Sequence, residues 1–121
     1  MFRLYSALFF ILSITSCSKS LPELENLDLS AWEKDKNACG EYRTNNIEAL
    51  HNQKEKLLAL KESQIIALLG RPDRNELYKR NQKFFYYYLM PSPDCPNASI
   101  ERKRLAIRFN AMGLAKEVAV E

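Results

Sequence analysis

The segment Gln64-Ile-Ile-Ala-Leu-Leu-Gly-Arg-Pro-Asp73 divides the sequence into a helical part and a part with the pattern of β-strands. Its apolar residues continue a helical spacing that begins upstream. Gly70 suits the position after a helix, because glycine takes the left-handed conformation without a steric penalty, and Pro72 cannot continue a helix. We therefore expect a helix over Glu62–Leu69 that ends at Gly70.

Two further helices are expected upstream of this segment. Ser30–Asn37 begins with a residue suited to the N-cap, and Glu33 follows at the spacing of a capping box. Trp32 in this helix is expected to be buried. Asn46–Ala59 places its apolar residues near a 3.6-residue period, which predicts an amphipathic helix. The pattern alone leaves open whether Leu60-Lys61 separates this helix from the next.

Downstream of Pro72 the apolar period changes to two, which is typical of strands. In the third strand Leu105, Ile107 and Phe109 are expected on one face, and in the fourth Leu114, Val118 and Val120 on one side. The expected strands are Glu76–Lys79, Lys83–Leu89, Lys103–Phe109 and Leu114–Val120, with turns at Arg80–Gln82 and Asn110–Gly113 and a proline-rich loop at Met90–Ser99. The order predicts a two-layer α+β fold, with N-terminal helices packed on a C-terminal antiparallel meander of three to four strands.

The first sixteen residues have the composition of an export signal. Arg3 supplies a positive charge, the apolar run Leu4–Ile14 follows, and no acidic residue occurs before Glu23. The run is shorter than the roughly 20 residues that a membrane-spanning helix requires. Residues 1–16 are therefore predicted to be a secretory signal peptide.

The four residues Ile14-Thr-Ser-Cys17 resemble the lipobox of bacterial lipoproteins. The resemblance implies a diacylglycerol on the thiol of Cys17, cleavage before Cys17 and an acylated amine. Ser18, rather than an aspartate, then favours the outer membrane. On this interpretation residues 17–29 are the lipidated cysteine and a tether, and residues 30–121 are a single domain. A plain signal peptide followed by a chance cysteine, or an uncleaved anchor, is the alternative.

Charge and cysteine content narrow the functional classes. The 121-residue chain has a formal net charge of +3, too small to indicate a nucleic-acid binder, and an exported protein has no access to cytoplasmic nucleic acid. Two cysteines remain beside Cys17, and disulfides persist in exported proteins. We expect one disulfide between Cys39 and Cys95, which would join the first helix to the proline-rich loop, with two free thiols as the alternative.

The sequence offers no recognisable catalytic or metal-binding pattern. His51 is the single histidine, and no serine or cysteine nucleophile with an orienting acid is evident around it. His51, Asp94 and the two cysteines are scattered without the spacing of metal ligands. We therefore expect neither an enzyme nor a cofactor.

From Leu60 onward the chain resembles the SmpA/OmlA (BamE-like) lipoproteins. The matching stretches are Gln64–Asp73, Tyr78–Tyr88 and Leu105–Gly113, where a short helix ends in Leu-Gly-x-Pro-Asp and a meander follows. Lys61 departs from the pattern, which has a Ser or Thr cap there, and the stretch Ser30–Ala59 is not part of it. The resemblance implies an accessory lipoprotein of outer-membrane β-barrel assembly that faces the periplasm and acts by binding other envelope proteins.

The same topology also resembles β-lactamase-inhibitor-type domains, which implies an inhibitor or ligand-binding domain unrelated to barrel assembly. Under either interpretation, a face or edge of the sheet is the expected partner surface.

The expected strand Lys83–Leu89, here called the aromatic strand, contains the five consecutive aromatic residues Phe84–Tyr88 and supplies the candidate binding residues. If the helices cover Phe85, Tyr87 and Leu89, the alternate residues point toward solvent and are available to anchor a partner. The candidate partner-binding residues are Phe84, Tyr86, Tyr88 and Arg80. The opposite arrangement, with Phe84, Tyr86 and Tyr88 facing the helices, is left open, and so is the possibility that all five aromatics pack internally. A basic cluster at Glu101–Arg104 is a second candidate, either for anionic lipid headgroups near the tether or as a solvated strand end.

Overall fold

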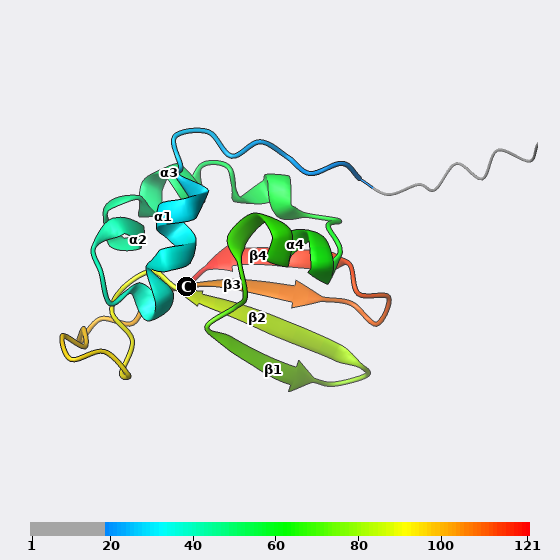
Figure 1. Ribbon diagram of the computed structural model, residues 1–121. Helices are drawn as coiled ribbons and strands as arrows, with labels where there is room; N and C mark the ends of the chain where they lie inside the picture. Colours follow the sequence, from blue (N-terminus) through cyan, green and yellow to red (C-terminus); the bar gives the residue numbers. More distant parts are fainter. Residues whose placement is uncertain (1–18) are drawn as a thin grey trace, which may run out of the picture.

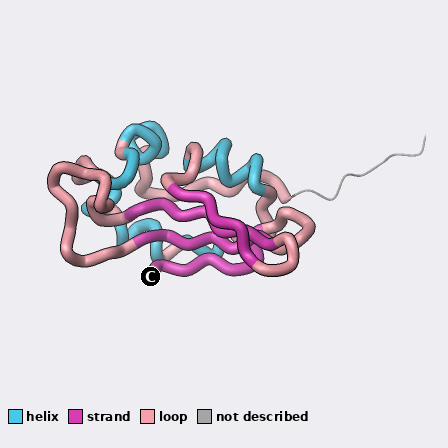
Figure 2. The backbone as a smooth tube through the Cα atoms, turned by 90° about the horizontal axis from the view of Figure 1, so that it is seen from below, coloured by secondary structure: helices cyan, strands magenta, loops and turns pink. Residues whose placement is uncertain are grey.

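The computed structural model describes residues 19–121 and has an antiparallel sheet with helices on one of its faces (Figures 1 and 2). The predicted signal peptide and Cys17 lie outside the described residues. The strand order is β1-β2-β3-β4, so that each strand pairs with its neighbours in sequence. The strands are β1 Arg74–Tyr78, β2 Gln82–Tyr88, β3 Arg104–Phe109 and β4 Ala115–Val120. The predicted α+β architecture with a C-terminal meander is confirmed.

The helical part consists of short segments: α1 Leu29–Lys34, η1 Lys36–Ala38, α2 Tyr42–Asn45, α3 Ile47–His51, η2 Lys54–Leu57 and α4 Glu62–Leu69. The predicted N-cap at Ser30 is wrong. Asp28 is the N-cap of α1, and its Oδ1 accepts hydrogen bonds from the backbone N–H groups of Ser30 and Ala31 at 3.0 and 3.2 Å. A carboxylate in this position satisfies the free N–H groups of the first turn and also suits the helix dipole.

The predicted long helix at Asn46–Ala59 is wrong as well, because the chain divides there into α3 and η2. Gln53, between the two, exchanges hydrogen bonds with the backbone of Glu25, whose N–H donates to Gln53 Oε1 and whose carbonyl accepts from Gln53 Nε2. This contact between distant segments holds Gln53 outside a helical conformation. Leu57 and Leu60 still reach the core and are fully buried.

Helix α4 has the bounds that the sequence predicts. Gly70 ends it with a φ of 77°, in the left-handed region that favours glycine. In place of a Ser or Thr cap, Gln64 Oε1 accepts a hydrogen bond from the N–H of Lys61 at 2.9 Å. The hydroxyl of Tyr87 donates to the carbonyl of Gly70 at 2.7 Å, and burial raises the pKa of this phenol, which stays protonated. The end of α4 is thereby fixed to the middle of the sheet.

The inner face of the sheet, which the helices cover, forms the core. Phe85, Tyr87 and Leu89 of the aromatic strand point inward, as do the β3 residues Leu105, Ile107 and Phe109. The sequence predicts that Leu114 lies on the same face of β4 as Val118 and Val120, and this prediction is wrong. A register shift between Arg108 and Phe109 lets Phe109 pair with Ala115 and Arg108 with Glu117, so that Lys116 is an extra residue. Ala115 therefore faces the core in place of Leu114.

The described part of the predicted tether packs on the domain. Leu24 belongs to the hydrophobic core with 6% of its surface exposed. Lys19 Nζ donates to the carbonyls of Lys56 and Leu58 at 2.9 and 2.8 Å, and the carbonyl of Lys19 accepts from Gln64. From Lys19 onward the predicted tether is therefore packed on the domain, because backbone and side-chain contacts fix this segment against η2, Leu58 and α4.

Candidate functional site on the outer sheet face

The sheet has a second face that none of the helices within residues 19–121 covers (Figure 2). Strand register places Arg74, Glu76 and Tyr78 of β1 on this outer face, because they stand opposite Tyr86, Phe84 and Gln82 of β2. The inner-face residues of β2 lie between these positions and point into the core. The parity of the aromatic strand, which the sequence leaves open, is thus decided by the helices packing on Phe85, Tyr87 and Leu89.

An aromatic row crosses the outer face from the sheet edge inward. The ring of Tyr78 meets Phe84 edge-on at 5.3 Å between centroids, and Phe84 stacks on Tyr86 at 5.5 Å. The guanidinium of Arg104 lies 3.7 Å from the centroid of the Tyr86 ring, within the range of a cation–π contact. The row is continuous from β1 to β3 and is built entirely by neighbours on the same face.

This row corrects part of the predicted binding surface. Tyr86 and Tyr88 keep only 6% and 7% of their surface exposed, so these two side chains do not point freely into solvent. Phe84 and Arg104 contact the ring of Tyr86 on this face, so its burial does not require a helix. Burial is the main cause of the raised pKa of Tyr86, which Arg104 opposes and Glu76 reinforces, so the phenol stays neutral. Phe84 is partly exposed, and the accessible aromatic surface lies at Phe84 and Tyr78.

Charged side chains on the β3–β4 half of the outer face are paired with each other. Arg104 Nε lies 2.9 Å from Glu121 Oε1, and Arg108 Nε lies 3.1 Å from Glu117 Oε2. On the β1 half, Arg74 meets Asp94 only at 4.0 Å, and both side chains are exposed. The β1 half of the face is therefore the part whose polar groups are available to a partner.

Strand β1 is also an exposed edge of the sheet. Every residue of β1 is solvent-exposed, and Leu77 and Tyr78 retain 87% and 49% of their surface. In the part of the chain that the structure describes, no strand pairs with the other side of β1. The β4 edge differs, because the N–H of Ala59 donates to the carbonyl of Ala115 and the N–H of Ala115 donates to the carbonyl of Leu60. Free backbone groups on an edge strand are able to pair with an added strand.

Arg80 lies in the β1–β2 turn directly beyond this edge. It is exposed, and Arg80 and Asn81 have φ values of 57° and 59°, as both central residues of a type I′ turn require. Together, the partly exposed aromatics, the β1 edge and the adjacent turn define the candidate site: Arg74, Glu76, Leu77, Tyr78, Arg80 and Phe84.

A buried ion pair holds β1 in place beneath the candidate site. Asp73, directly before β1, accepts from Arg43 Nη1 at 2.6 Å and from the Tyr88 N–H at 2.8 Å with Oδ2, and from the Asn37 N–H at 3.0 Å with Oδ1. Arg43 also donates from Nε to the carbonyl of Trp32 at 3.0 Å. Both charged side chains are nearly fully buried. Sequence reasoning missed Arg43, since nothing around a single arginine in a polar stretch indicates burial.

Two of the three cysteines form the predicted disulfide. Cys39 and Cys95 are bonded, with their Cα atoms 5.4 Å apart. The N–H of Ser92 donates to the carbonyl of Asn37 at 3.0 Å, so the loop between β2 and β3 is joined to η1 by a backbone contact as well. The bond thus links the helical layer to the sheet, as expected from the sequence.

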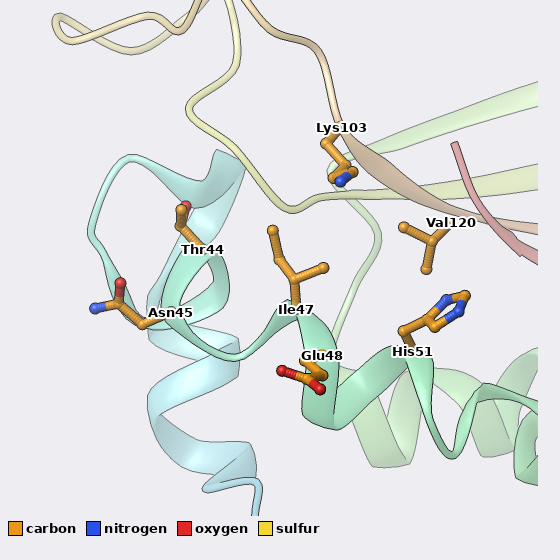
Figure 3. Close-up of a pocket in the computed structure, with 7 residues that line it drawn as sticks. All are labelled: Thr44, Asn45, Ile47, Glu48, His51, Lys103 and Val120. Carbon is orange, nitrogen blue, oxygen red and sulfur yellow. The ribbon is translucent and has the colours of Figure 1, made fainter.

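A groove of about 570 Å³ lies apart from this site, between α2–α3 and the end of the sheet where β4 finishes (Figure 3). Ile47 and Val120 form its apolar part, and His51, Glu48 and Lys103 surround them with polar groups. The size is typical of pockets for small ligands. Among residues 19–121, His, Cys, Asp and Glu form no group of three or more that is able to hold a metal ion.

The described residues contain no helix that is both long and apolar enough to cross a membrane. In comparisons with known proteins, no family model, curated protein or solved structure matches the chain. The resemblance to the SmpA/OmlA lipoproteins therefore stays a prediction, and functional inference rests on the geometry of the site.

Proposed function

We propose that this protein is a lipid-anchored lipoprotein of the cell envelope that binds another protein and performs no catalysis. The observation that carries the binding role is the outer sheet face, where Tyr78 and Phe84 keep accessible aromatic surface on and beside the exposed edge strand β1. An extended segment of a partner would add to β1 through its backbone, while Tyr78 and Phe84 would supply apolar contacts.

The proposed partner is a component of outer-membrane β-barrel assembly, and the protein would act as an accessory scaffold on the periplasmic side. This part of the proposal is supported by the sequence resemblance over Gln64–Gly113 and by the lipobox at Ile14–Cys17. A small domain with an open sheet face suits such a role, since binding requires no reactive group.

Replacing Cys17 by alanine tests the anchor. We expect the variant to appear in the soluble fraction of envelope preparations, because several acyl chains, each stabilised by about 0.8 kcal/mol per buried CH₂, would be lost. Fractionation and mass measurement of the N-terminal peptide check this result, and Ser18→Ala serves as a control that keeps the cysteine. Persistent membrane association of the alanine variant would contradict the proposed anchor.

Alanine at both Tyr78 and Phe84 tests the binding surface. Aromatic residues at the centre of an interface contribute about 2 kcal/mol or more, so we expect at least about a thirtyfold loss of partner affinity. A photo-crosslinking residue at Leu77 should attach to the partner in native membranes, whereas the same residue at the exposed Ile100 should not. Equal crosslinking at both positions would argue against a partner on the β1 edge.

The alternative function, a periplasmic inhibitor or ligand-binding domain, draws support from the groove beside His51. The double variant His51→Ala and Lys103→Glu alters this groove at exposed side chains and leaves the outer face unchanged. A loss of binding in this variant, with normal binding in the Tyr78 and Phe84 variant, would favour the alternative.

A further inference from the structure

The position at which the chain enters the domain has a geometric consequence for anchoring, if the proposed lipid on Cys17 is present. Lys19 is fixed to the carbonyls of Lys56 and Leu58. Lys19 lies two positions after the anchoring Cys17, so the chain between their Cα atoms spans at most about 7 Å. The domain would therefore lie directly on the membrane, with the surface around Lys19 turned toward the lipid.

The same end of the molecule contains both tight turns of the meander. In Figures 1 and 2 the described N-terminus lies at the end where β1 turns into β2 and β3 into β4. Lys61 connects the two features, because it forms a bridge with Leu114 directly after the second turn. We define the turn-end surface by its exposed residues Lys19, Lys61, Lys79, Arg80, Met112 and Lys116.

The turn-end surface has the chemistry of a membrane-contacting surface. Five of its six residues are basic, and none of the five forms an ion pair among residues 19–121. Glu62, next to Lys61, is neutralised by Lys83 at 2.9 Å. Met112 projects from the second turn with 82% of its surface exposed, and an apolar hollow that includes Leu58 and Leu114 lies beside it. Basic residues close to an anionic leaflet each contribute about 1 kcal/mol to attraction.

The basic cluster suggested by the sequence lies in the wrong place for this role. Glu101–Arg104 leads into β3 at the opposite end of the sheet, and Arg104 is already paired with Glu121. Strands of this length separate the two ends by about 20 Å, which is twice the Debye length at moderate salt. The turn-end surface is therefore the one attracted to anionic lipid, whereas the cluster at 101–104 stays in the aqueous phase.

We propose that the turn-end surface sits on a bilayer with anionic headgroups, with Met112 at the lipid boundary and basic side chains around it. This orientation rests on the proposed anchor at Cys17. It places the strands steeply to the membrane, so that the β1 edge and the outer face project away from the lipid and stay open to a protein partner.

The test uses the lipidated full chain in vesicles of phosphatidylcholine, with and without the anionic lipid phosphatidylserine. Met112→Cys and Ile100→Cys form a matched pair, because both original side chains are apolar and highly exposed, at opposite ends of the sheet. Cys39 and Cys95 are bonded and Cys17 would carry lipid, so a thiol-reactive fluorophore labels only the new position. Nitroxide-bearing lipid in the vesicles reports contact with the membrane by quenching.

We expect the nitroxide lipid to remove most of the emission from the probe at position 112 in anionic vesicles and little from the probe at position 100. Reversing three charges by Lys79→Glu, Arg80→Glu and Lys116→Glu should restore the emission. Each lost cation weakens the binding of the turn-end surface to the anionic bilayer about fivefold. The two reversals Arg102→Glu and Lys103→Glu, at the opposite end of the sheet, should leave the quenching unchanged.

Two kinds of failure are distinguishable. If mass measurement shows no lipid on Cys17 and the protein does not attach to vesicles, the proposed anchor is overturned and this orientation with it. A lipidated protein that joins the vesicles but shows equal quenching at positions 112 and 100, or stronger quenching at 100, would overturn the orientation alone.

Discussion

Replacing Asp73 by alanine is expected to lower the free energy of unfolding by about 3–5 kcal/mol, because the change leaves a buried, unpaired charge. Arg43 would lose its carboxylate partner at 2.6 Å while its side chain stays 1% exposed. The N–H groups of Asn37 and Tyr88 would lose their acceptor as well. The helical layer and the start of β1 would then be held together by fewer contacts.

Urea unfolding followed by the fluorescence of Trp32 measures this effect, since the ring lies 4.6 Å from the Arg43 guanidinium. The double variant Arg43→Met and Asp73→Leu should lose less stability than Asp73→Ala, because no charge is left buried. Arg74→Ala is the control, as its pair with Asp94 is exposed and should contribute at most about 1 kcal/mol. A loss below that of the control would show that the buried pair does not stabilise the fold.

Removing the disulfide by Cys39→Ala and Cys95→Ala is expected to cost about 4 kcal/mol, from the entropy of the unfolded chain in the loop-closure model. The bonded residues are 56 positions apart, so the cross-link restrains about half of the described chain when it unfolds. The midpoint of urea unfolding, compared with the oxidised wild type, gives the difference.

Alkylation of the non-reduced wild type provides an independent check of the bond. We expect a single peptide pair that joins Cys39 to Cys95 and no labelled thiol at either position. Two alkylated cysteines would contradict the bond, and the large stability difference would then have no basis.

The parts of the fold that could be predicted from the sequence depend on local signals. Gly70 and Pro72 end α4 by their own backbone restrictions, so its bounds needed no knowledge of the rest of the molecule. The alternation of Leu105, Ile107 and Phe109 likewise defined the inner face of β3. The order of elements then sufficed to predict the meander and the layer of helices.

Apart from the N-cap of α1, the differences from the sequence predictions concern features that depend on residues outside the local pattern. The break at Gln53 depends on Glu25, and the extra residue Lys116 in β4 depends on the register with β3. Docking of the predicted tether depends on carbonyls in η2 and the segment that follows it. The first and third are contacts between segments far apart in the chain, and the second is set by strand pairing across the β3–β4 hairpin, so none of them leaves a periodic pattern in the sequence.

The sequence predicted a face or edge of the sheet as the candidate site, but some of the residues that it named for this site are buried. The aromatic strand led to a sheet face as the candidate, although the sequence left open which of its side chains point outward, and Phe84 remains in the site. Tyr86 and Tyr88 were expected to be accessible, but both are buried, and Phe84 and Arg104 contact the Tyr86 ring. The exposure of Tyr78 and Leu77 was missed, because a strand with one apolar and one aromatic residue gives no sign that it forms a sheet edge.

The fixed position of Lys19 has a consequence for the maturation of the proposed lipoprotein. The predicted cleavage and acylation at Cys17 lie two residues before Lys19, so the enzymes that carry them out would act directly beside this contact. Once Gln64 and the Lys56 and Leu58 carbonyls hold Lys19, the folded domain would lie against the chain on the C-terminal side of the predicted cleavage point. Processing would therefore have to precede docking of this segment, so that a prematurely folded precursor would remain uncut.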